Sequence, residues 1–363
     1  MESDSMAAKA PARRYRGAVT DLGRRPTKAA VMADVARLAG VSHQTVSRVI
    51  NNSPSLRPET RRRVQEAIDR LGYRPNTAAR ALVRGRTGTI GIISTGTTYF
   101  GPTSIQRTIE AAAHSSGLFA SSVSLSTLTR ASLDASVEHL MRQLVEGIII
   151  IAGQDDALDL ARSRTVSVPV VLVEGDLSRA EWTVGVDQVA GARMATRHLI
   201  ELGHREIAHL AGPQDWSEAR ARLEGWRMEM AAAKLRPPEP IFGDWSTEFG
   251  YSAGARIATD KDITAVFTAN DPIAIGLLSA LHDAGRAVPD EISIVGFDNQ
   301  PETAYLIPPL TTVAQDFPAV GRRAVDTIMR AISGLPASEK NLIDPELIIR
   351  SSTASPRFAA KRR

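Results

Sequence analysis

The sequence contains no cysteine, which excludes disulfide bonds, Cys-ligated zinc sites and a thiol nucleophile. It also has no run of about 18 apolar residues, so nothing in it predicts a membrane-spanning helix. The N-terminal stretch MESDSMAAKAPARRYRGAV is polar and arginine-rich, without the apolar core of a secretory signal. We therefore expect a cytoplasmic protein that makes no membrane contact.

Charge is distributed unevenly along the 363 residues, although the net charge is only +4. Residues 1–86 hold 18 Lys and Arg against 7 Asp and Glu, a balance of +11, so the remaining residues carry −7. A basic head favours nucleic acid as a partner, because neutralised phosphates contribute much of nucleic-acid affinity. The alternative interpretation is a solvated basic tail.

The segment VMADVARLAGVSHQTVSRVINN has the residue spacing of a helix-turn-helix. Ala36 is small enough for a second helix to pack closely, and Gly40 follows it in the turn. Val46 and Val49 lie on one face of the second helix, and Ser42 is placed to cap its N-terminus. The alternative is a small helical subdomain with a solvated polar face.

The outward face of this second helix predicts contacts with double-stranded DNA. Long polar side chains near the start of a recognition helix reach base edges in the major groove, and here they are Ser42, His43, Gln44, Ser47 and Arg48. Phosphate contacts position the helix without reading the sequence, and we assign them to Thr45, Asn51, Thr60 and Arg61.

From residue 88 onward the pattern changes to short apolar runs that alternate with helical stretches. The runs include 89–94, 117–125, 147–152, 168–174, 206–211, 264–270 and 291–297, and the helices include 104–116, 131–145, 188–202, 217–234 and 272–284. Alternation of apolar strands with helices predicts parallel sheets covered on both faces. There are too many strands for one small sheet, so we expect two α/β lobes.

Polar side chains follow many of these apolar runs. They include Ser94, Glu174, Asp187, Asn270, Asp298 and Gln315, and the loop after the first run holds Tyr99–Pro102. Open α/β sheets bind ligands at the carboxyl ends of their strands. Carboxylates, amides, Arg222 and Trp245 together suit a sugar, since they pair with its hydroxyls and cover its apolar face.

The same carboxylates leave a glycosidase open as an alternative, with an acid/base pair drawn from Glu174, Asp271 and Asp298. Such an enzyme would not need the basic head. The sequence has no GxGxxG, no GxxxxGK[ST] and no pair of His residues four apart with a Glu, so we expect no cofactor and no metal. A sugar-binding protein of the periplasmic type would need an export signal and no helix-turn-helix.

The segment SHQTVSRVIN resembles the DNA-binding head of the lactose repressor (LacI/GalR) family of bacterial transcription regulators. Further matching stretches follow in order, namely NTAARALVRGRTGTIG, HLIELGHREIAHLAGP, ARLEGWR, GDWS, TANDPIAIG, ISIVGFDN and IPPLTTVAQDF. The resemblance extends from about residue 28 to 355. It implies an all-α helix-turn-helix head and a periplasmic-binding-protein-like body of two parallel-sheet lobes.

The resemblance also implies particular site residues. In that family a hinge helix enters the minor groove, where Leu82 would wedge into a base step with Ala79 beside it. The family's inducer site falls on Arg222, Trp245, Asn270, Asp298, Gln315 and Phe317, with Glu174 in place of an aspartate. Tyr99, Gly101, Pro102 and Ile105 would line its apolar end. The retained residues imply a galactoside effector.

The sequence and the resemblance together predict the domain organisation. We expect a disordered basic extension (1–26), a helix-turn-helix domain (27–75), a hinge helix (76–87), an effector-binding and dimerisation body (88–355) and a basic tail (356–363). Within the body we assign 88–186 and 317–344 to the N-lobe, and 187–316 and 345–355 to the C-lobe.

The predicted function is that of an allosteric, non-enzymatic repressor of sugar-utilisation genes. A dimer would bind a pseudo-palindromic operator and release it when a sugar binds between the lobes. We expect a homodimer, because the chain ends in SPRFAAKRR without the leucine-heptad helix that joins dimers into tetramers. The alternatives within this fold are another glycoside as the effector, or a co-repressor, as in the purine-sensing members that bind DNA only with ligand.

Overall fold

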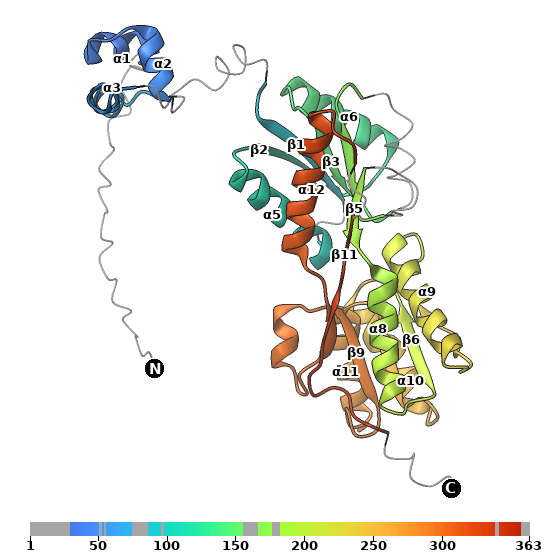
Figure 1. The fold of residues 1–363 in the computed structure, drawn as a ribbon. Helices are drawn as coiled ribbons and strands as arrows, with labels where there is room; N and C mark the ends of the chain where they lie inside the picture. The colour runs from blue at the N-terminus through green and yellow to red at the C-terminus, as the bar shows by residue number, and fades with distance from the viewer. Residues whose placement is uncertain are drawn as a thin grey trace, which may run out of the picture. The chain divides into compact units, whose positions relative to one another are not determined.

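The structure is a computed structural model that describes residues 30–50, 53, 56–74, 86–95, 98–154, 166–175, 182–337 and 341–356. The chain divides into two compact units, Met1–Val83 and Arg84–Arg363 (Figure 1). Within the described residues, no helix is long and apolar enough to cross a membrane.

The described part of the first unit contains three helices, α1 (Met32–Ala39), α2 (His43–Ile50) and α3 (Pro58–Leu71). They share one small core to which Val35, Val46, Val49 and Val64 contribute buried side chains. Gly40 ends α1 with φ 60°, and the N–H of Val41 donates to the carbonyl of Ala36 at 3.0 Å. Glycine suits this left-handed turn because it has no Cβ to strain.

The second unit contains two lobes, each built on a twisted sheet. In the described residues, the N-lobe sheet has the strand order β11-β5-β4-β3-β1-β2 with every pair parallel. Its strands are β1 (Thr89–Thr95), β2 (Phe119–Leu125), β3 (Ile148–Ile151), β4 (Val170–Val173), β5 (Thr183–Val186) and β11 (Leu342–Ile343).

The C-lobe sheet has the order β12-β10-β9-β8-β6-β7, and only its edge strand β12 runs antiparallel to its neighbour within the part of the chain that is described. The strands are β6 (Ile207–Ala211), β7 (Ile241–Phe242), β8 (Ala265–Thr268), β9 (Ser293–Asp298), β10 (Thr311–Ala314) and β12 (Glu346–Ile348). The two parallel-sheet lobes predicted from the sequence are therefore confirmed.

Helices cover both faces of each sheet, which explains the alternation of strand and helix in the sequence. In the N-lobe, α5 (Phe100–Ser115) and α12 (Phe317–Ile332) pack on one face and α6 (Arg130–Arg142) on the other. In the C-lobe, the corresponding pairs are α8 (Gln188–Glu201) with α9 (Ser217–Ala232), and α10 (Thr247–Thr259) with α11 (Asp271–Asp283). A short 3-10 helix, η1 (Pro301–Tyr305), follows β9.

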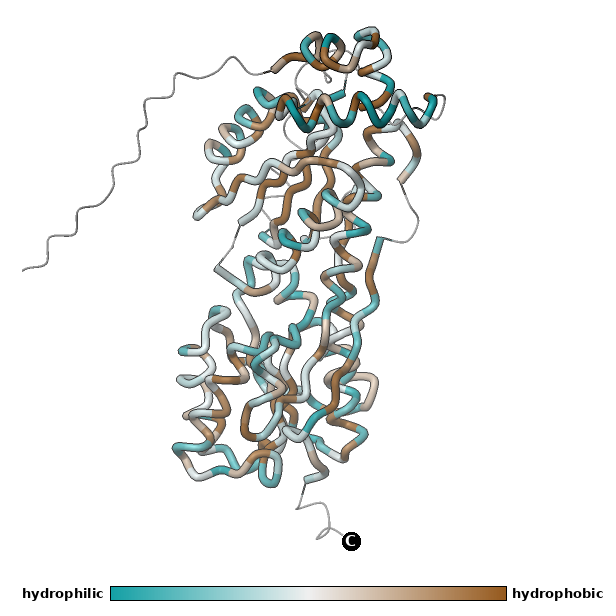
Figure 2. The backbone as a smooth tube through the Cα atoms, turned by 90° about the vertical axis from the view of Figure 1, so that its left-hand side faces the viewer, coloured by the Kyte–Doolittle hydropathy of each residue, from teal (hydrophilic) through white to brown (hydrophobic). Residues whose placement is uncertain are grey.

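The central strands are buried on both sides, so their sequences are continuously apolar rather than alternating. β3 is the clearest case, since all four isoleucines of Ile148–Ile151 are buried. In Figure 2 the tube is mostly brown, or hydrophobic, along the strands inside each lobe and is largely teal and white on the helices around them. β2 is the exception, because this edge strand reads FASSVSL and is largely exposed.

The chain passes between the lobes three times within the described residues. It crosses after β5 at Asp187, after β10 at Gln315 and Asp316, and between β11 and β12. These crossings place the carboxyl ends of both sheets opposite each other.

Candidate functional site

The recognition helix α2 begins where the sequence predicts. The hydroxyl of Ser42 accepts a hydrogen bond from the backbone N–H of Thr45 at 3.1 Å, which is an N-cap contact. Val46 and Val49 face the core, whereas His43, Gln44 and Arg48 are exposed on the other side of the helix. The exposed side chains are therefore free of core packing and available to a groove of DNA.

The predicted phosphate-contacting residues lie in different settings. Thr45 on α2 and Thr60 at the start of α3 are half-buried, as is Ser47, which was predicted to read base edges. The guanidinium of Arg61 donates to the carbonyl of Ser53 at 2.8 Å, so it helps to fix the connection between α2 and α3. Asn51, Ala79 and Leu82, together with the predicted basic extension and most of the hinge and the basic tail, lie outside the described residues.

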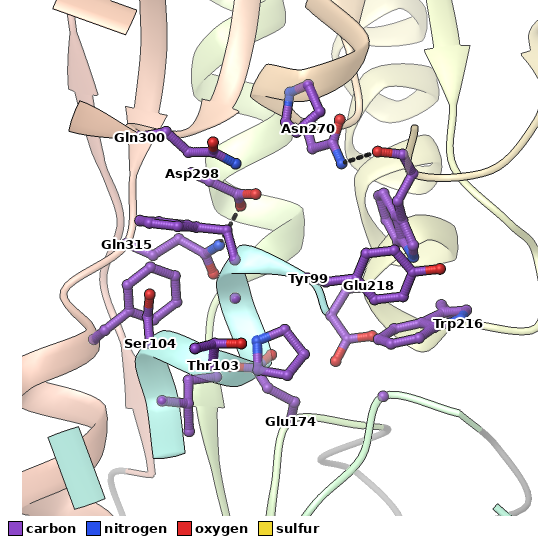
Figure 3. Close-up of a pocket in the computed structure, with 18 of the residues that line it drawn as sticks. Tyr99, Thr103, Ser104, Glu174, Trp216, Glu218, Asn270, Asp298, Gln300 and Gln315 are labelled. Atoms are coloured by element: carbon purple, nitrogen blue, oxygen red, sulfur yellow. Dashed lines mark hydrogen bonds between the residues drawn. The ribbon is translucent and has the colours of Figure 1, made fainter. Parts of the chain in front are cut away.

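A cavity of about 620 Å³ lies between the N-lobe and the C-lobe, at the carboxyl ends of their strands (Figure 3). It is lined by all of the residues that the sequence assigned to an effector, namely Tyr99, Gly101, Pro102, Ile105, Glu174, Arg222, Trp245, Asn270, Asp298, Gln315 and Phe317. The folded chain thus brings residues more than 200 positions apart around one cavity of the size that suits a small ligand.

Aromatic rings form one wall of this cavity. Tyr99, just before α5, meets Trp216 edge-on with ring centroids 5.6 Å apart, and Trp216 meets Trp245 edge-on at 5.9 Å. Trp245 is buried, and its indole Nε1–H makes no hydrogen bond within the described residues. An unused donor and flat apolar faces at one wall can serve a sugar ring and its hydroxyls.

Arg222 holds a network of polar groups at the base of the cavity. Its Nε–H donates to Oε1 of Gln188 at 2.9 Å, one terminal N–H group donates to the carbonyl of Ala269, and Nη2 lies 3.6 Å from Oδ1 of Asp298. Gln315 closes a ring, because its Nε2 donates to Asp298 at 2.7 Å while its Oε1 accepts from Gln188 at 2.9 Å. Burial raises the pKa of Asp298 to about 6, although Arg222 and the Gln315 hydrogen bond lower it.

Three aromatic rings, those of Phe297, Phe267 and His209, pack in a row beneath the guanidinium of Arg222. Its guanidinium carbon lies 3.8 Å from the ring centroid of Phe297, and Phe267 packs between Phe297 and His209. His209 stacks on Phe267 at 4.8 Å, and its Nδ1–H donates to the Phe267 carbonyl at 2.9 Å. Burial lowers the pKa of His209 to about 4, so this residue is neutral. Its Nε2 makes no hydrogen bond in the described structure.

Glu174 enters the cavity from the end of β4. Its Oε2 accepts from Nε2 of Gln188 at 3.3 Å, whereas its Oε1 is buried without a hydrogen bond in the described part of the chain. Burial and then the carboxylate of Glu218 raise the pKa of Glu174 to about 8, while Arg222 lowers it. Both Glu174 (φ 67°) and Asp298 (φ 109°) have left-handed backbone conformations.

Asn270 serves the fold as well as the cavity. Its Oδ1 accepts from the N–H of Ile273 at 2.9 Å and caps α11, and its Nδ2 donates to the carbonyl of Trp245 at 3.1 Å. Asn270 is therefore the N-cap of α11 as well as part of the cavity wall.

Sequence reasoning missed several polar and aromatic residues that line the cavity, among them Gln188, Trp216, Glu218 and Gln300. Gln188, Trp216 and Glu218 lie at or beside the first turn of a helix that follows a strand end. Extending the strand-end rule by a few residues would have found them.

Asp271 lies away from the cavity, which weighs against a catalytic carboxylate pair that includes it. It is fully buried, and it accepts hydrogen bonds from Oγ1 of Thr312 at 2.6 Å and the N–H of Gln300 at 2.8 Å. Burial, and after it the charge of the nearby Asp298, raises its pKa to about 8. Asp271 therefore anchors the loop after β9. No cluster of three metal-binding side chains occurs among the described residues.

Two family models match the chain. Residues 31–76 match bacterial regulatory proteins of the lacI family, and residues 196–353 match a periplasmic binding protein-like domain. The lactose operon repressor of Escherichia coli strain K12 is 32% identical over 334 residues, covering 91% of this chain and 92% of that protein.

Two other curated relatives are as similar. The repressor PurR of Haemophilus influenzae strain PittEE is 33% identical, covering 90% of this chain and 99% of that protein. The regulator CelR of Thermobifida fusca is 33% identical, covering 91% and 98%.

Solved structures give the same picture. A lac repressor dimer bound to operator and the anti-inducer ONPF has a TM-score of 0.80 at 30% identity, covering 90% of this chain and all of that one. A CelR–cellobiose complex has a TM-score of 0.66 at 31% identity with the same coverage.

Proposed function

The chain belongs to the lacI family of bacterial regulatory proteins, and we propose that it represses sugar-utilisation genes until a galactoside binds between its lobes. It is a DNA-binding transcriptional repressor with an effector-binding domain, and it is not an enzyme. Its place of action is the cytoplasm, where operator DNA lies.

The proposed DNA contacts follow from the first unit. His43, Gln44 and Arg48 are exposed on α2, and the basic balance of residues 1–86 suits a phosphate backbone. Ser42 and Ser47 complete the base-reading face, and Thr45, Asn51, Thr60 and Arg61 position it. Ala79 and Leu82 are assigned to the minor groove, which a wedged side chain opens by unstacking a base step.

A homodimer on a pseudo-palindromic operator completes this proposal. The C-lobe exposes two large apolar side chains beside η1, with Tyr305 86% and Ile307 97% accessible. Neighbouring exposed apolar side chains of this size mark an interaction surface. A relative, the lac repressor, is a dimer on its operator in a solved structure. Two copies would place two α2 helices in successive major grooves.

The single observation that carries the sugar assignment is the chemistry of the cavity wall. One side offers the unused Nε1–H donor of Trp245 with the aromatic faces beside it, and another offers the unused Oε1 of Glu174. Between them stand Arg222 and Asp298, a buried pair that can donate to and accept from vicinal hydroxyls. Donors and acceptors around aromatic faces suit a hexose better than a planar base.

Release of DNA requires that the sugar bind the two lobe arrangements with different affinities. The cavity touches residues of both lobes, so a bound sugar favours one angle between them. The N-lobe begins directly after the hinge, so its rotation changes the spacing of the two hinges in a dimer. Such couplings are typically about 1–3 kcal/mol, which is about a 5- to 150-fold change in operator affinity.

A gel-shift experiment tests the proposal. The full chain first selects its operator from a random duplex library, and lactose, methyl β-galactoside, cellobiose and a purine base are then titrated into the complex. We expect a galactoside to weaken DNA binding. A response to cellobiose alone would replace the galactoside by another glycoside, and tighter DNA binding with the purine would make the ligand a co-repressor.

A matched pair of variants ties the response to the cavity. Arg222→Met removes the cation at the base of the cavity and should abolish the sugar response while operator binding persists. Arg227→Met makes the same change on the exposed side of α9 and should keep the response. Equal responses in both variants would contradict the assignment of the sugar to this cavity.

A further inference from the structure

Two carboxyl side chains from different lobes meet at one corner of the cavity. Glu174 extends from the end of β4 in the N-lobe, and Glu218 lies in the first turn of α9 in the C-lobe. Oε1 of Glu218 accepts from the N–H of Gly175 at 3.3 Å, and Gly175 directly follows Glu174. Figure 3 shows both side chains among those that surround the cavity.

The two lobes are also joined by hydrogen bonds at this corner. The N–H and the hydroxyl of Ser217 both donate to the carbonyl of Gly153, at 2.9 and 3.0 Å. A Cβ at position 153 would overlap Oε2 of Glu218, so a larger residue there would displace that carboxylate. The two carboxyl groups come from different lobes, so their separation depends on the angle between the lobes.

Negative charge at this corner lacks an equal counter-charge. Among the described cavity residues, Arg222 is the only buried cation, and it already serves Asp298, Gln188 and Ala269. The other charged groups on the surrounding elements are Arg107 of α5, Asp187 before α8, and Arg220 and Glu224 of α9, none of which is buried. Two buried carboxylates beside each other are costly, because like charges and low dielectric both favour the protonated form.

The hydrogen bonds around the pair leave room for a proton on Glu174. Gln188 donates to Oε2 of Glu174 and the N–H of Gly175 donates to Oε1 of Glu218, while the Ser217 hydroxyl, which donates to Gly153, lies 3.2 Å from Oε2 of Glu218. Oε1 of Glu174 has no hydrogen bond among the described residues. Burial and the Glu218 carboxylate both raise the pKa of Glu174, which keeps it protonated at neutral pH.

A second cavity gives the pair a path to solvent. Glu174, Gln188 and Glu218 also line a space of about 440 Å³ on the other side, together with Asp187, Glu224 and Leu342. The pair is thus part of the wall between the two cavities. A proton can reach it without passing through the effector.

We propose that Glu218 is an effector-site residue whose carboxylate keeps Glu174 protonated across the cleft between the lobes, so that effector binding weakens as the pH rises. The proton on Glu174 removes one of the two negative charges at the corner against which an uncharged sugar binds. Its loss leaves two neighbouring carboxylates, which repel each other across the cleft. The identity of the ligand as a sugar rests on the function proposed above, whereas the protonation of Glu174 does not.

The first test uses the full chain without ligand. Infrared spectra from pH 5.5 to 9.5 report protonated carboxyl groups, and we expect a component near pH 8 that Glu174→Gln removes and that Glu218→Gln moves to lower pH. Asp271 contributes a second protonated carboxyl, which both variants should retain. An unchanged spectrum in Glu174→Gln would overturn the proposal, because Glu174 would then be ionised.

The second test follows affinity by calorimetry with methyl β-galactoside, or with whichever sugar of the panel binds. Between pH 7 and 9 the wild-type affinity should fall about tenfold, since a group with pKa about 8 passes from mostly protonated to mostly ionised. Glu174→Gln should show no such fall, and Glu218→Gln should shift it to lower pH. Glu224→Gln, the same change two turns along α9, should keep the wild-type profile.

The outcomes separate the two proposals. If no sugar binds at any pH, the sugar assignment fails and the infrared titration alone decides whether Glu218 keeps Glu174 protonated. If a sugar binds with the same affinity at pH 7 and 9, the linkage is wrong and the sugar assignment stands. A pH profile that Glu224→Gln alters as much as Glu218→Gln would also refute the pair, because a general charge effect would then explain it.

Discussion

Replacing His209 by phenylalanine tests whether the stability of the aromatic packing beneath Arg222 depends on His209 being neutral. The imidazole stacks between Phe267 and Trp226 and is fully buried, which lowers its pKa from 6.5 to about 4. Because the folded-state pKa is depressed, the stabilisation is present above pH 6.5 and is lost as the pH falls toward 4. Phenylalanine keeps the stacked ring and removes the proton-binding group.

The expected change in unfolding free energy follows from the lowered pKa of His209. Each pKa unit corresponds to 1.36 kcal/mol, so between pH 7.5 and 4.5 the wild-type protein should lose about 2–3 kcal/mol more unfolding free energy than His209→Phe. At pH 7.5 the variant should differ from the wild type by only about 1 kcal/mol, the usual value of the lost hydrogen bond to the Phe267 carbonyl.

Urea unfolding followed by tryptophan fluorescence measures this difference. Trp216, Trp226 and Trp245 all belong to the C-lobe, so they report on the lobe that contains His209. His114→Phe, on the exposed surface of α5, is the control and should follow the wild type. Equal acid losses in the wild type and in His209→Phe would refute the reasoning, since the buried imidazole would then carry its ordinary pKa.

Three further predictions concern the head, the buried aspartate and the dimer. Arg48→Ala should weaken binding to the selected operator by about 1–3 kcal/mol and relax preference at one base pair, whereas Arg62→Ala on α3 should not, as measured by gel shift. Asp271→Asn should flatten the stability profile between pH 4 and 8, because the raised pKa makes the wild type lose stability as the pH rises through that range, as urea unfolding would reveal. Ile307→Asp should convert the dimer to a monomer in sedimentation, and a dimer that persists would locate the interface elsewhere.

Much of the fold could be predicted from the sequence because burial on both faces leaves a strong signal. β3 consists of four isoleucines, all of them buried. A run this short and this apolar, next to turn residues, favours a buried strand over a helix or a loop. The two-residue strands β7 and β11 and the three-residue β12 carry no such signal, since a few residues cannot show a period. The chain crosses between the lobes from β11 to β12, whereas β7 is placed by its pairing with β6.

In the candidate site, too, some residues could be predicted from the sequence and others could not. Glu174, Asn270 and Asp298 follow apolar runs, so the strand-end rule finds them. Trp216 and Glu218 belong to the helix start of the opposite lobe, and they line one cavity with Glu174 because that cavity lies between the lobes. A pattern within one segment does not encode a contact between two lobes, which is why the carboxyl pair was not foreseen.

The left-handed backbones of Glu174 and Asp298 bear on how this protein would change under selection. Residues held at such φ values cost about 1–3 kcal/mol each, and glycine or asparagine removes much of that cost. Selection for heat resistance alone would therefore favour Gly or Asn at both positions. If the proposed function holds, such descendants would be more stable and would still bind operator, but they would no longer respond to the effector. The carboxylates at these two positions would then persist only where control of transcription is itself under selection.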